Sequence, residues 1–409
     1  MKRCLVLSAA AVICSVIVFC AGGCLDSADD PGESLSGLAG MPFLVTVNAD
    51  TGAGTGSYSL TGGFRIEKNI ASFDTSDLGV AVWNDSIFIY GKYMADWLAR
   101  FSLDNPDEPL YQYSTVGGSE STMNPSDVVI VNNDTGYVLR YASSVSWIID
   151  PSPEDEPSFK TGEIDLSDYE TEGLDFDMNP CDYPPNPVQA VVRGNTMYLL
   201  LERSNGWAYD KDALLLTLDI SVPSAPAVTD EFTLIVRSPN VMQLMGNSIY
   251  IAGWGMLGWS EGGQTPTGGI EKVDISAGPG SYTSGLLVDD DDGSDSYGSD
   301  YTYGGAAMDV AVLSSDLGYI YFGEWNVPVY RIHPFNPSTG EVYSSAKILD
   351  GVNIAKIAPN PAGNITAAAG FVSRQTQAGI YEITYSSGDY SVTGPVSVGL
   401  EPTDFDYND

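Results

Sequence analysis

Residues 127–141 read DVVIVNNDTGYVLRY, two short apolar runs on either side of the polar segment NNDTG. The runs are rich in β-branched and aromatic residues, which favour strands. Asn, Asp and Gly between them supply the positive φ angles that tight turns require. The stretch therefore predicts an antiparallel β-hairpin.

The same hairpin pattern recurs five more times along the chain. The further copies lie at residues 79–91, 190–201, 241–253, 308–323 and 355–370. With the turns aligned at Asp85, Thr135, Asn195, Asn247, Leu317 and Asn364, the intervals are 50, 60, 52, 70 and 47 residues. Beyond the first 23 residues no window shows a sustained helical period, so the recurrence predicts four-stranded blades of a β-propeller, which repeat every ~40–50 residues.

Some of these segments also resemble known propeller repeats. Residues 125–150, PSDVVIVNNDTGYVLRYASSVSWIID, resemble a YVTN-type repeat. Residues 217–234, TLDISVPSAPAVTDEFTL, resemble an LVIVD-type repeat, and residues 99–116 are a looser copy. The resemblance implies a propeller but no particular function, because one fold carries many unrelated functions.

The two ends of the domain predict how the ring closes. Residues 402–408, PTDFDYN, are similar to the start of a blade, PSDVVIV at 125–131. Residues 42–73 contain strands but no evident innermost strand. We therefore predict a single all-β domain over residues 42–409, with about seven four-stranded blades and a C-terminal strand that completes the first blade. Six or eight blades, or an open pair of β-sandwiches, are the alternatives.

The N-terminus has the features of an export signal. Lys2 and Arg3 precede an apolar run at residues 4–21, which leads into Ala21-Gly22-Gly23-Cys24. The last four residues resemble the lipobox of bacterial lipoproteins, with Ala21 where that family usually has Leu. The resemblance implies that residues 1–23 are removed and that Cys24 is lipidated. An uncleaved membrane anchor is the alternative, since 18 apolar residues can just span a bilayer.

The segment at residues 24–41 is polar, acidic and rich in Gly and Ser, which predicts a flexible tether. Its Ser27-Ala28-Asp29-Asp30 is similar to the acidic surface-export signals of some Bacteroidetes lipoproteins. We therefore expect an outer-membrane lipoprotein of a bacterial cell envelope, either periplasmic or surface-exposed, bound to the membrane through its N-terminal lipid.

Charge and cysteine content limit the classes of partner. The chain has 54 acidic and 17 basic residues, a net charge of −37. Such a surface repels phosphate backbones, so nucleic acid is not expected as a partner, whereas divalent cations and basic proteins are compatible. Of the five cysteines, three lie in the signal and Cys24 is the lipidation site, so we predict no disulfide for Cys181 within the mature chain.

Four aspartates stand in register near the starts of innermost strands. Asp77, Asp127 and Asp309 each precede the aligned turn position by eight residues, and Asp404 holds the matching place near the C-terminus. In a propeller their side chains would surround one mouth of the central channel. Carboxylates facing a common space can bind Ca²⁺, so these four are candidate metal ligands, and calcium is the only candidate cofactor. The alternative is that each Asp accepts hydrogen bonds from nearby backbone N–H groups.

Two loops were further candidates for binding. Residues 253–269, GWGMLGWSEGGQTPTGG, carry Trp254 and Trp259 among glycines, and exposed Trp can stack on a sugar or anchor an interface. Residues 289–300, DDDDGSDSYGSD, fail the EF-hand pattern and predict a solvated loop.

Catalytic signatures are scarce. The chain has one histidine, His333, with no nucleophile motif near it, and it has no phosphate-binding glycine motif. The leading hypothesis is a binding scaffold for a protein or glycan partner. The alternative is a hydrolase or lyase that uses carboxylates, with or without calcium.

Overall fold

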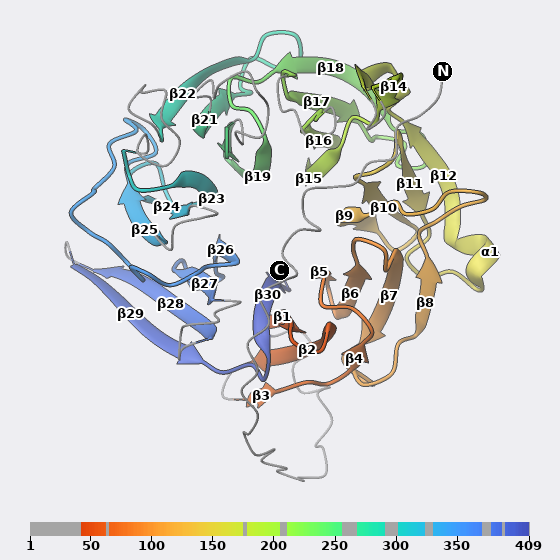
Figure 1. Ribbon diagram of the computed structural model, residues 1–409, viewed down its shortest axis with the longest axis horizontal. Helices are drawn as coiled ribbons and strands as arrows, with labels where there is room; N and C mark the ends of the chain where they lie inside the picture. Colours follow the sequence, from red (N-terminus) through yellow and green to blue (C-terminus); the bar gives the residue numbers. More distant parts are fainter. Residues whose placement is uncertain are drawn as a thin grey trace.

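Each of the six predicted hairpins forms the two innermost strands of a blade, and the blades follow one another around a ring (Figure 1). The computed structural model describes residues 42–62, 65–174, 178–204, 211–255, 268–290, 302–323, 330–369, 378–386 and 389–408. Together the sheets of these residues form seven antiparallel blades. The predicted all-β propeller and its blade number are confirmed.

We number the blades from the N-terminus, and their strands are these. Blade 1 contains β1 (Phe43–Asp50), β2 (Thr55–Gly62), β3 (Arg65–Glu67), β4 (Ser72–Phe73) and β30 (Glu401–Tyr407). Blade 2 contains β5 (Leu78–Trp83), β6 (Ser86–Gly91), β7 (Trp97–Ser102) and β8 (Tyr111–Ser114). Blade 3 contains β9 (Pro125–Asn132), β10 (Thr135–Arg140), β11 (Val145–Ile149) and β12 (Lys160–Asp165). Blade 4 contains β15 (Pro187–Arg193), β16 (Thr196–Leu201), β17 (Leu214–Asp219) and β18 (Ala227–Thr233).

The remaining blades follow the same order from the channel outward. Blade 5 contains β19 (Pro239–Met245), β20 (Ser248–Gly253), β21 (Gly269–Asp274) and β22 (Thr283–Asp289). Blade 6 contains β23 (Ala306–Val312), β24 (Gly318–Gly323) and β25 (Arg331–Phe335). Blade 7 contains β26 (Lys356–Pro359), β27 (Ile365–Ala369), β28 (Gly379–Ser386) and β29 (Asp389–Val396).

Among the described residues, two strands and two helical turns lie outside the blades. A separate hairpin pairs β13 (Thr171–Leu174) with β14 (Pro180–Tyr183), and the helical elements are α1 (Glu156–Phe159) and the 3-10 turn η3 (Ser167–Tyr169). Within the described ranges, no helix is both long and apolar enough to cross a membrane.

Four of the six hairpin turns contain a residue of positive φ, as the sequence predicts, whereas the fully described turns of blades 3 and 6 contain none. Asn84 has a φ of 52°, and Gly194 and Gly246 have φ angles of 60° and 58°. Each lies in the turn of an innermost hairpin, where two-residue connections need positive φ. These short turns set the register in which β-branched and aromatic residues alternate between the two faces of each sheet.

The ring closes within blade 1. β30 is its innermost strand and pairs antiparallel with β1, from Leu44 opposite Tyr407 to Ala49 opposite Glu401. The C-terminus accordingly lies toward the middle of the ring (Figure 1). The predicted closure by the two ends of the domain is confirmed, and it pairs an edge of β1 that would otherwise be exposed.

The apolar core is divided among the blade interfaces. Seven clusters of buried side chains lie between successive pairs of neighbouring blades, including the pair formed by blades 7 and 1. Six clusters have between 9 and 13 buried members among the described residues. The cluster at the closing interface has five, including Leu44, Ala368 and Phe405. Among the described residues, the closing interface therefore has the smallest apolar cluster of the seven.

Candidate functional site

Three of the four aligned aspartates bind backbone N–H groups in the same way. One carboxylate oxygen accepts from the N–H of the following residue, and the other accepts from an N–H on the innermost strand of the next blade. The bonds to the next blade are Asp127 to Ala190 (2.9 Å), Asp309 to Ile357 (2.7 Å) and Asp404 to Val80 (3.3 Å). Because buried backbone N–H groups need partners, these carboxylates join neighbouring blades.

The residue at this level can be identified in every blade. Val80, Ala190 and Ile357 hold equivalent places in their innermost strands. In every blade, the residue at this level is the one directly before that place. We call this set the channel ring, and its members from blade 1 to blade 7 are Asp404, Gly79, Asp127, Gln189, Val241, Asp309 and Lys356. Gln189 replaces the carboxylate with an amide, and its Oε1 accepts from the N–H of Met242 at 2.6 Å.

Asp77 lies outside the channel ring. It is exposed, and it precedes the ring member Gly79 by two residues. A side chain at Gly79 has no room, since an added Cβ would lie 2.3 Å from the ring of Tyr90. Tyr90 is buried, and its hydroxyl donates to the backbone O of Ser126 in blade 3. In blade 2 a tyrosine hydroxyl thus takes over the contact to the next blade.

Two further bonds of this kind lie one step deeper along the strands. Asp406 accepts from the N–H of Val82 at 2.7 Å. Gln243 accepts from the N–H of Val312 at 2.6 Å, and its amide nitrogen donates to the Val312 oxygen at 2.9 Å. Sequence reasoning missed Asp406, Gln189 and Gln243, since it looked only for aspartate at one fixed distance from the turn.

Lys356 is the cationic member of the channel ring. Its Nζ donates to Asp404 Oδ1 and to the backbone O of Phe405, each at 2.8 Å. Burial disfavours the ammonium form, but the carboxylates of Asp404, Asp406 and Asp309 outweigh burial and raise the pKa of Lys356 above its ordinary value. A fixed positive charge therefore sits where the sequence led us to consider a metal ion.

The carboxyl groups around Lys356 fall into two classes. Burial alone would raise the pKa of Asp404, but Lys356 and Lys92 outweigh it and lower that pKa. Burial raises the pKa of Asp309 to about 7 and those of Asp127 and Asp406 to about 6, although backbone N–H groups and Lys356 act in the opposite direction. These three groups therefore change charge near neutral pH.

Calcium binding stays a prediction. In the part of the chain that the structure describes, no three metal-ligating side chains gather into one group. Asp127 and Asp309 each already accept two backbone N–H bonds. A calcium ion would have to compete with these bonds and with the Lys356 ammonium.

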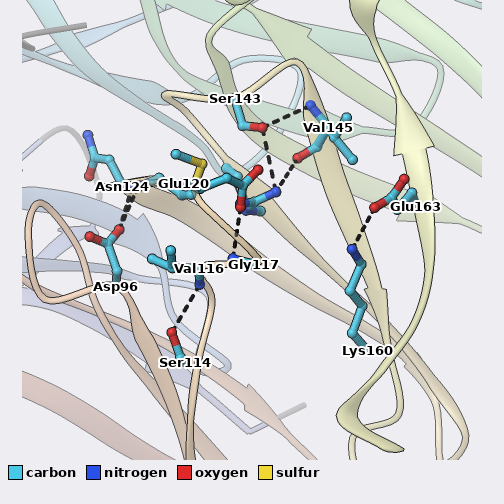
Figure 2. A network of polar contacts seen from close by, with 12 residues as sticks. Asp96, Ser114, Val116, Gly117, Glu120, Asn124, Ser143, Val145, Lys160 and Glu163 are labelled. Carbon is cyan, nitrogen blue, oxygen red and sulfur yellow. Dashed lines mark hydrogen bonds and ion pairs between the residues drawn. The ribbon is translucent and has the colours of Figure 1, made fainter. Parts of the chain in front are cut away.

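Other acidic side chains between blades 2 and 3 hold backbone segments in place (Figure 2). Asp96 Oδ1 accepts from the N–H groups of Met123 (2.8 Å) and Asn124 (2.7 Å). Glu120 accepts from a backbone N–H and pairs with Arg140, a residue only 1% exposed whose guanidinium lies 4.5 Å from the Trp147 ring centre. This network has a structural role, because its charged groups are already paired.

Of the two candidate tryptophans, the structure describes Trp254 but not Trp259. Trp254 follows β20 and is half-buried, with its backbone N–H bonded to the Ser238 oxygen at 3.1 Å. Trp259 lies outside the described residues. Their role in ligand binding therefore stays a prediction.

Two expectations need correction. Asp289 ends strand β22, and Asp290 is buried and accepts from the N–H of Ala307 at 2.8 Å, so these two residues do not belong to a solvated loop. The rest of the segment at 291–300 lies outside the described residues. Cys181 is buried in β14 and is disulfide-bonded, whereas counting cysteines in the mature chain predicted no such bond. The other cysteines are Cys4, Cys14, Cys20 and Cys24, so this bond and a mature lipoprotein that has lost residues 1–23 and carries a lipid on Cys24 exclude one another.

His333 belongs to the core. It is 1% exposed, its Nδ1 lies 2.9 Å from the Ala346 oxygen, and its ring contacts Phe322 and Tyr303. Burial lowers its pKa, so the ring is neutral at physiological pH. These contacts explain why His333, the one histidine in the sequence, is buried, and they require no catalytic role for it.

A groove between blades 6 and 7 was not foreseen. It encloses about 810 Å³ next to the turn that joins β23 to β24. Three tyrosines, two aspartates and an asparagine give it its chemical character: Tyr343, Tyr385, Tyr390, Asp316, Asp389 and Asn336. They come from three segments that only the folded ring brings together, and we name this feature the tyrosine groove.

Comparison with known proteins identifies the fold. No protein-family pattern matches the chain, and no curated protein matches its sequence. Solved structures do match. A proposed 6-phosphogluconolactonase from Bacteroides fragilis aligns with a TM-score of 0.58 at 10% identity, over 93% of this chain and 100% of the other. The architecture is that of a seven-bladed β-propeller.

Two more structures give the same result. A proposed 6-phosphogluconolactonase from Bacteroides uniformis aligns with a TM-score of 0.58 at 11% identity, over 90% of this chain and 99% of its own. A protein from Lactobacillus plantarum aligns with a TM-score of 0.58 at 12% identity, over 90% and 99% of the two chains. At such low identity the similarity concerns the fold alone.

Proposed function

We propose that this protein is a lipid-anchored propeller of a bacterial cell envelope that binds a glycan or protein partner. The tyrosine groove is the observation that carries the proposal, because it combines aromatic surfaces with polar groups in a hollow of ligand size. The lipobox-like residues ending at Cys24 support the anchor, and the repeats at 125–150 and 217–234 support a place among YVTN- and LVIVD-like propellers.

The channel ring supports binding over catalysis. Its carboxylates accept backbone N–H bonds between blades, and Lys356 compensates part of their charge. Groups that hold a fold together in this way cannot easily exchange partners with a substrate. In this proposal the channel ring therefore stabilises the contacts between neighbouring blades.

Hydrolysis is the second candidate, and one residue favours it. Burial raises the pKa of Glu202 to about 7, and the Tyr141 hydroxyl donates to its carboxylate. A carboxyl group with such a pKa suits general acid catalysis. The fold neighbours from Bacteroides, proposed as 6-phosphogluconolactonases, make a phosphorylated lactone the substrate to test.

We expect the purified protein to leave 6-phosphogluconolactone hydrolysis at its spontaneous rate. The net charge of −37 repels a phosphorylated substrate, which lowers the rate of productive encounter. The measurement is proton release in weak buffer, with wild type and Glu202→Gln in parallel. Rate enhancement by the wild type that the Glu202→Gln protein lacks would replace the binding proposal by the enzymatic one.

We expect Cys24→Ser to abolish lipid attachment. Without the thiol no diacylglycerol can be transferred, so the protein should move from the detergent phase to the aqueous phase in a Triton X-114 partition and should incorporate no labelled palmitate. Ser27→Ala is the matched control, because it changes a residue just beyond the lipobox-like segment and should leave the label in place. Palmitate labelling that persists in Cys24→Ser would refute the anchor.

A further inference from the structure

The tyrosine groove lies between parts of blades 6 and 7 that are distant in sequence. Asp316 comes from the turn between β23 and β24, and Asn336 and Tyr343 come from the segment after β25. Tyr385 and Tyr390 come from the β28–β29 hairpin. Its volume of about 810 Å³ falls within the range of small-ligand sites.

The tyrosines present ring faces and not only hydroxyl groups. The rings of Tyr385 and Tyr390 lie 5.0 Å apart at 34°, and Tyr385 is 45% exposed. Tyr390 is held from behind by the buried Tyr319, whose ring meets it edge-on at 6.2 Å and 82°. Aromatic faces carry negative charge density and attract the weakly positive C–H groups of a pyranose ring. The pair thus offers one exposed and one supported surface for stacking.

Polar groups around these rings have unused hydrogen-bonding capacity. Asn336 Oδ1 accepts from the N–H groups of Ser338 (2.8 Å) and Thr339 (3.1 Å), which fixes the amide and leaves its nitrogen as a donor. Within the described ranges, the Asp389 carboxylate has no hydrogen-bond partner and the Asp316 carboxylate accepts from the Ser315 hydroxyl alone. Two acceptors and a fixed donor beside two neighbouring tyrosine rings match the alternating hydroxyl and C–H surfaces of a sugar.

Charge selects among saccharides. The described residues that line the groove include two carboxylates, those of Asp316 and Asp389, and no basic side chain. Uronic acids, sulfated sugars and phosphates would be repelled by Asp316, by Asp389 and by the overall charge of −37. A basic peptide is the competing ligand, but both carboxylates are exposed, and exposed ion pairs contribute little.

We propose that the tyrosine groove binds a neutral saccharide chain by stacking on Tyr385 and Tyr390. The inference rests on the proposed function and deepens it, because it names one ligand class and one site. Binding should be insensitive to salt, since no charged group of the ligand takes part.

The test is calorimetric titration of the full-length protein, held in a detergent without a sugar headgroup. The probes are neutral hexasaccharides of β-1,4-glucose, β-1,4-mannose, β-1,4-N-acetylglucosamine and α-1,4-glucose, with hexagalacturonate and hexalysine for comparison. At least one neutral probe should bind with a Kd on the order of 0.1–1 mM. Tyr385→Ala should weaken that binding at least about tenfold, while Tyr385→Phe, which keeps the ring, should retain most of it.

The matched control is Tyr113→Ala, which removes a stacked tyrosine of blade 2 whose ring lies 4.8 Å from that of Tyr111. It should bind like the wild type. Binding of hexalysine alone, no binding of any neutral probe, or equal affinity in Tyr385→Ala would overturn the saccharide groove. If the wild type and Tyr385→Ala were retained equally on isolated envelope polysaccharide, the groove would be rejected and the proposed function kept. If neither protein were retained, both the groove and the glycan form of the proposed function would be rejected.

Discussion

Lys356→Met is expected to lower the free energy of unfolding by about 2–3 kcal/mol at about pH 8, and by much less at about pH 5. Lys356 donates to Asp404. The charges of Asp309 and Asp406 raise the pKa of Lys356, and the charge of Lys356 acts to lower the pKa of Asp127. Removing one partner of a buried pair leaves the other charge uncompensated, which typically costs about 3–5 kcal/mol. The side chain of Lys356 is 35% exposed, so water screens part of this loss and the expected value is smaller.

The direction of the pH effect follows from the raised carboxyl pKa values. Asp309, near 7, and Asp127 and Asp406, near 6, hold protons more tightly in the folded state than in the unfolded state. They therefore stabilise the fold at low pH, and this contribution is lost as pH rises through about 6 to 7. The wild type should unfold at higher urea at about pH 5 than at about pH 8. Without the Lys356 charge their pKa values rise further, so the variant should show a steeper dependence.

Urea unfolding followed by circular dichroism at the two pH values measures both effects. Lys347→Met is the matched control, because it makes the same change at an exposed lysine nine positions earlier and should cost less than about 0.5 kcal/mol. Asp309→Asn should flatten the wild-type pH dependence, which separates this group from general charge repulsion. If Lys356→Met lowered the free energy of unfolding by the same amount at both pH values, Lys356 would not compensate the charge of the channel carboxylates.

The sequence predicted the blades because their pattern is local. The innermost hairpins combine short strand-forming runs with polar turns, four of which contain a residue of positive φ, and all six predicted hairpins form. The closing strand was also predictable, since PTDFDYN at the C-terminus repeats the start of a blade. A local signal of this kind survives insertions in the long loops between strands.

The channel ring was only partly predictable because its spacing varies. Asp127 precedes the first residue of β10 by eight positions, whereas Gln189 precedes the first residue of β16 by seven. The difference is a β-bulge in blade 3, where the pairing shifts between Thr135 and Gly136, while blade 4 pairs without interruption from Gln189 onward. Counting eight residues back from the turn therefore included Asp77 and omitted Gln189. Lys356 does lie eight residues before Asn364, but it was passed over because only aspartates were sought.

The tyrosine groove had no sequence signal at all. Tyr343 lies in the loop after β25 and Tyr385 lies 42 positions later in blade 7. Nothing in either segment shows that the two residues line one hollow, because that depends on how two blades pack. Sites built at interfaces between repeats become visible only when the ring is assembled.

Removal of residues 401–409 is expected to abolish cooperative folding. The cut takes away β30 and exposes the edge of β1, and it removes Phe405, which is 1% exposed in the smallest of the seven apolar clusters. It also deletes the acceptors of the Val80 and Val82 N–H groups and of Lys356. The combined loss should exceed about 5 kcal/mol, which is comparable with the whole stability of a typical domain.

The truncated chain should show no cooperative transition in calorimetry and should elute as expanded or aggregated material in gel filtration. Because the missing strand binds by edge pairing, a peptide of residues 399–409 added in trans should restore a melting transition in proportion to its concentration, and a scrambled peptide should not. Phe405→Ala provides the milder test, since it should stay folded and lose about 3–5 kcal/mol through the cavity that it creates. A truncated chain that melts cooperatively within a few degrees of the wild type would show that the first and last strands do not close this ring.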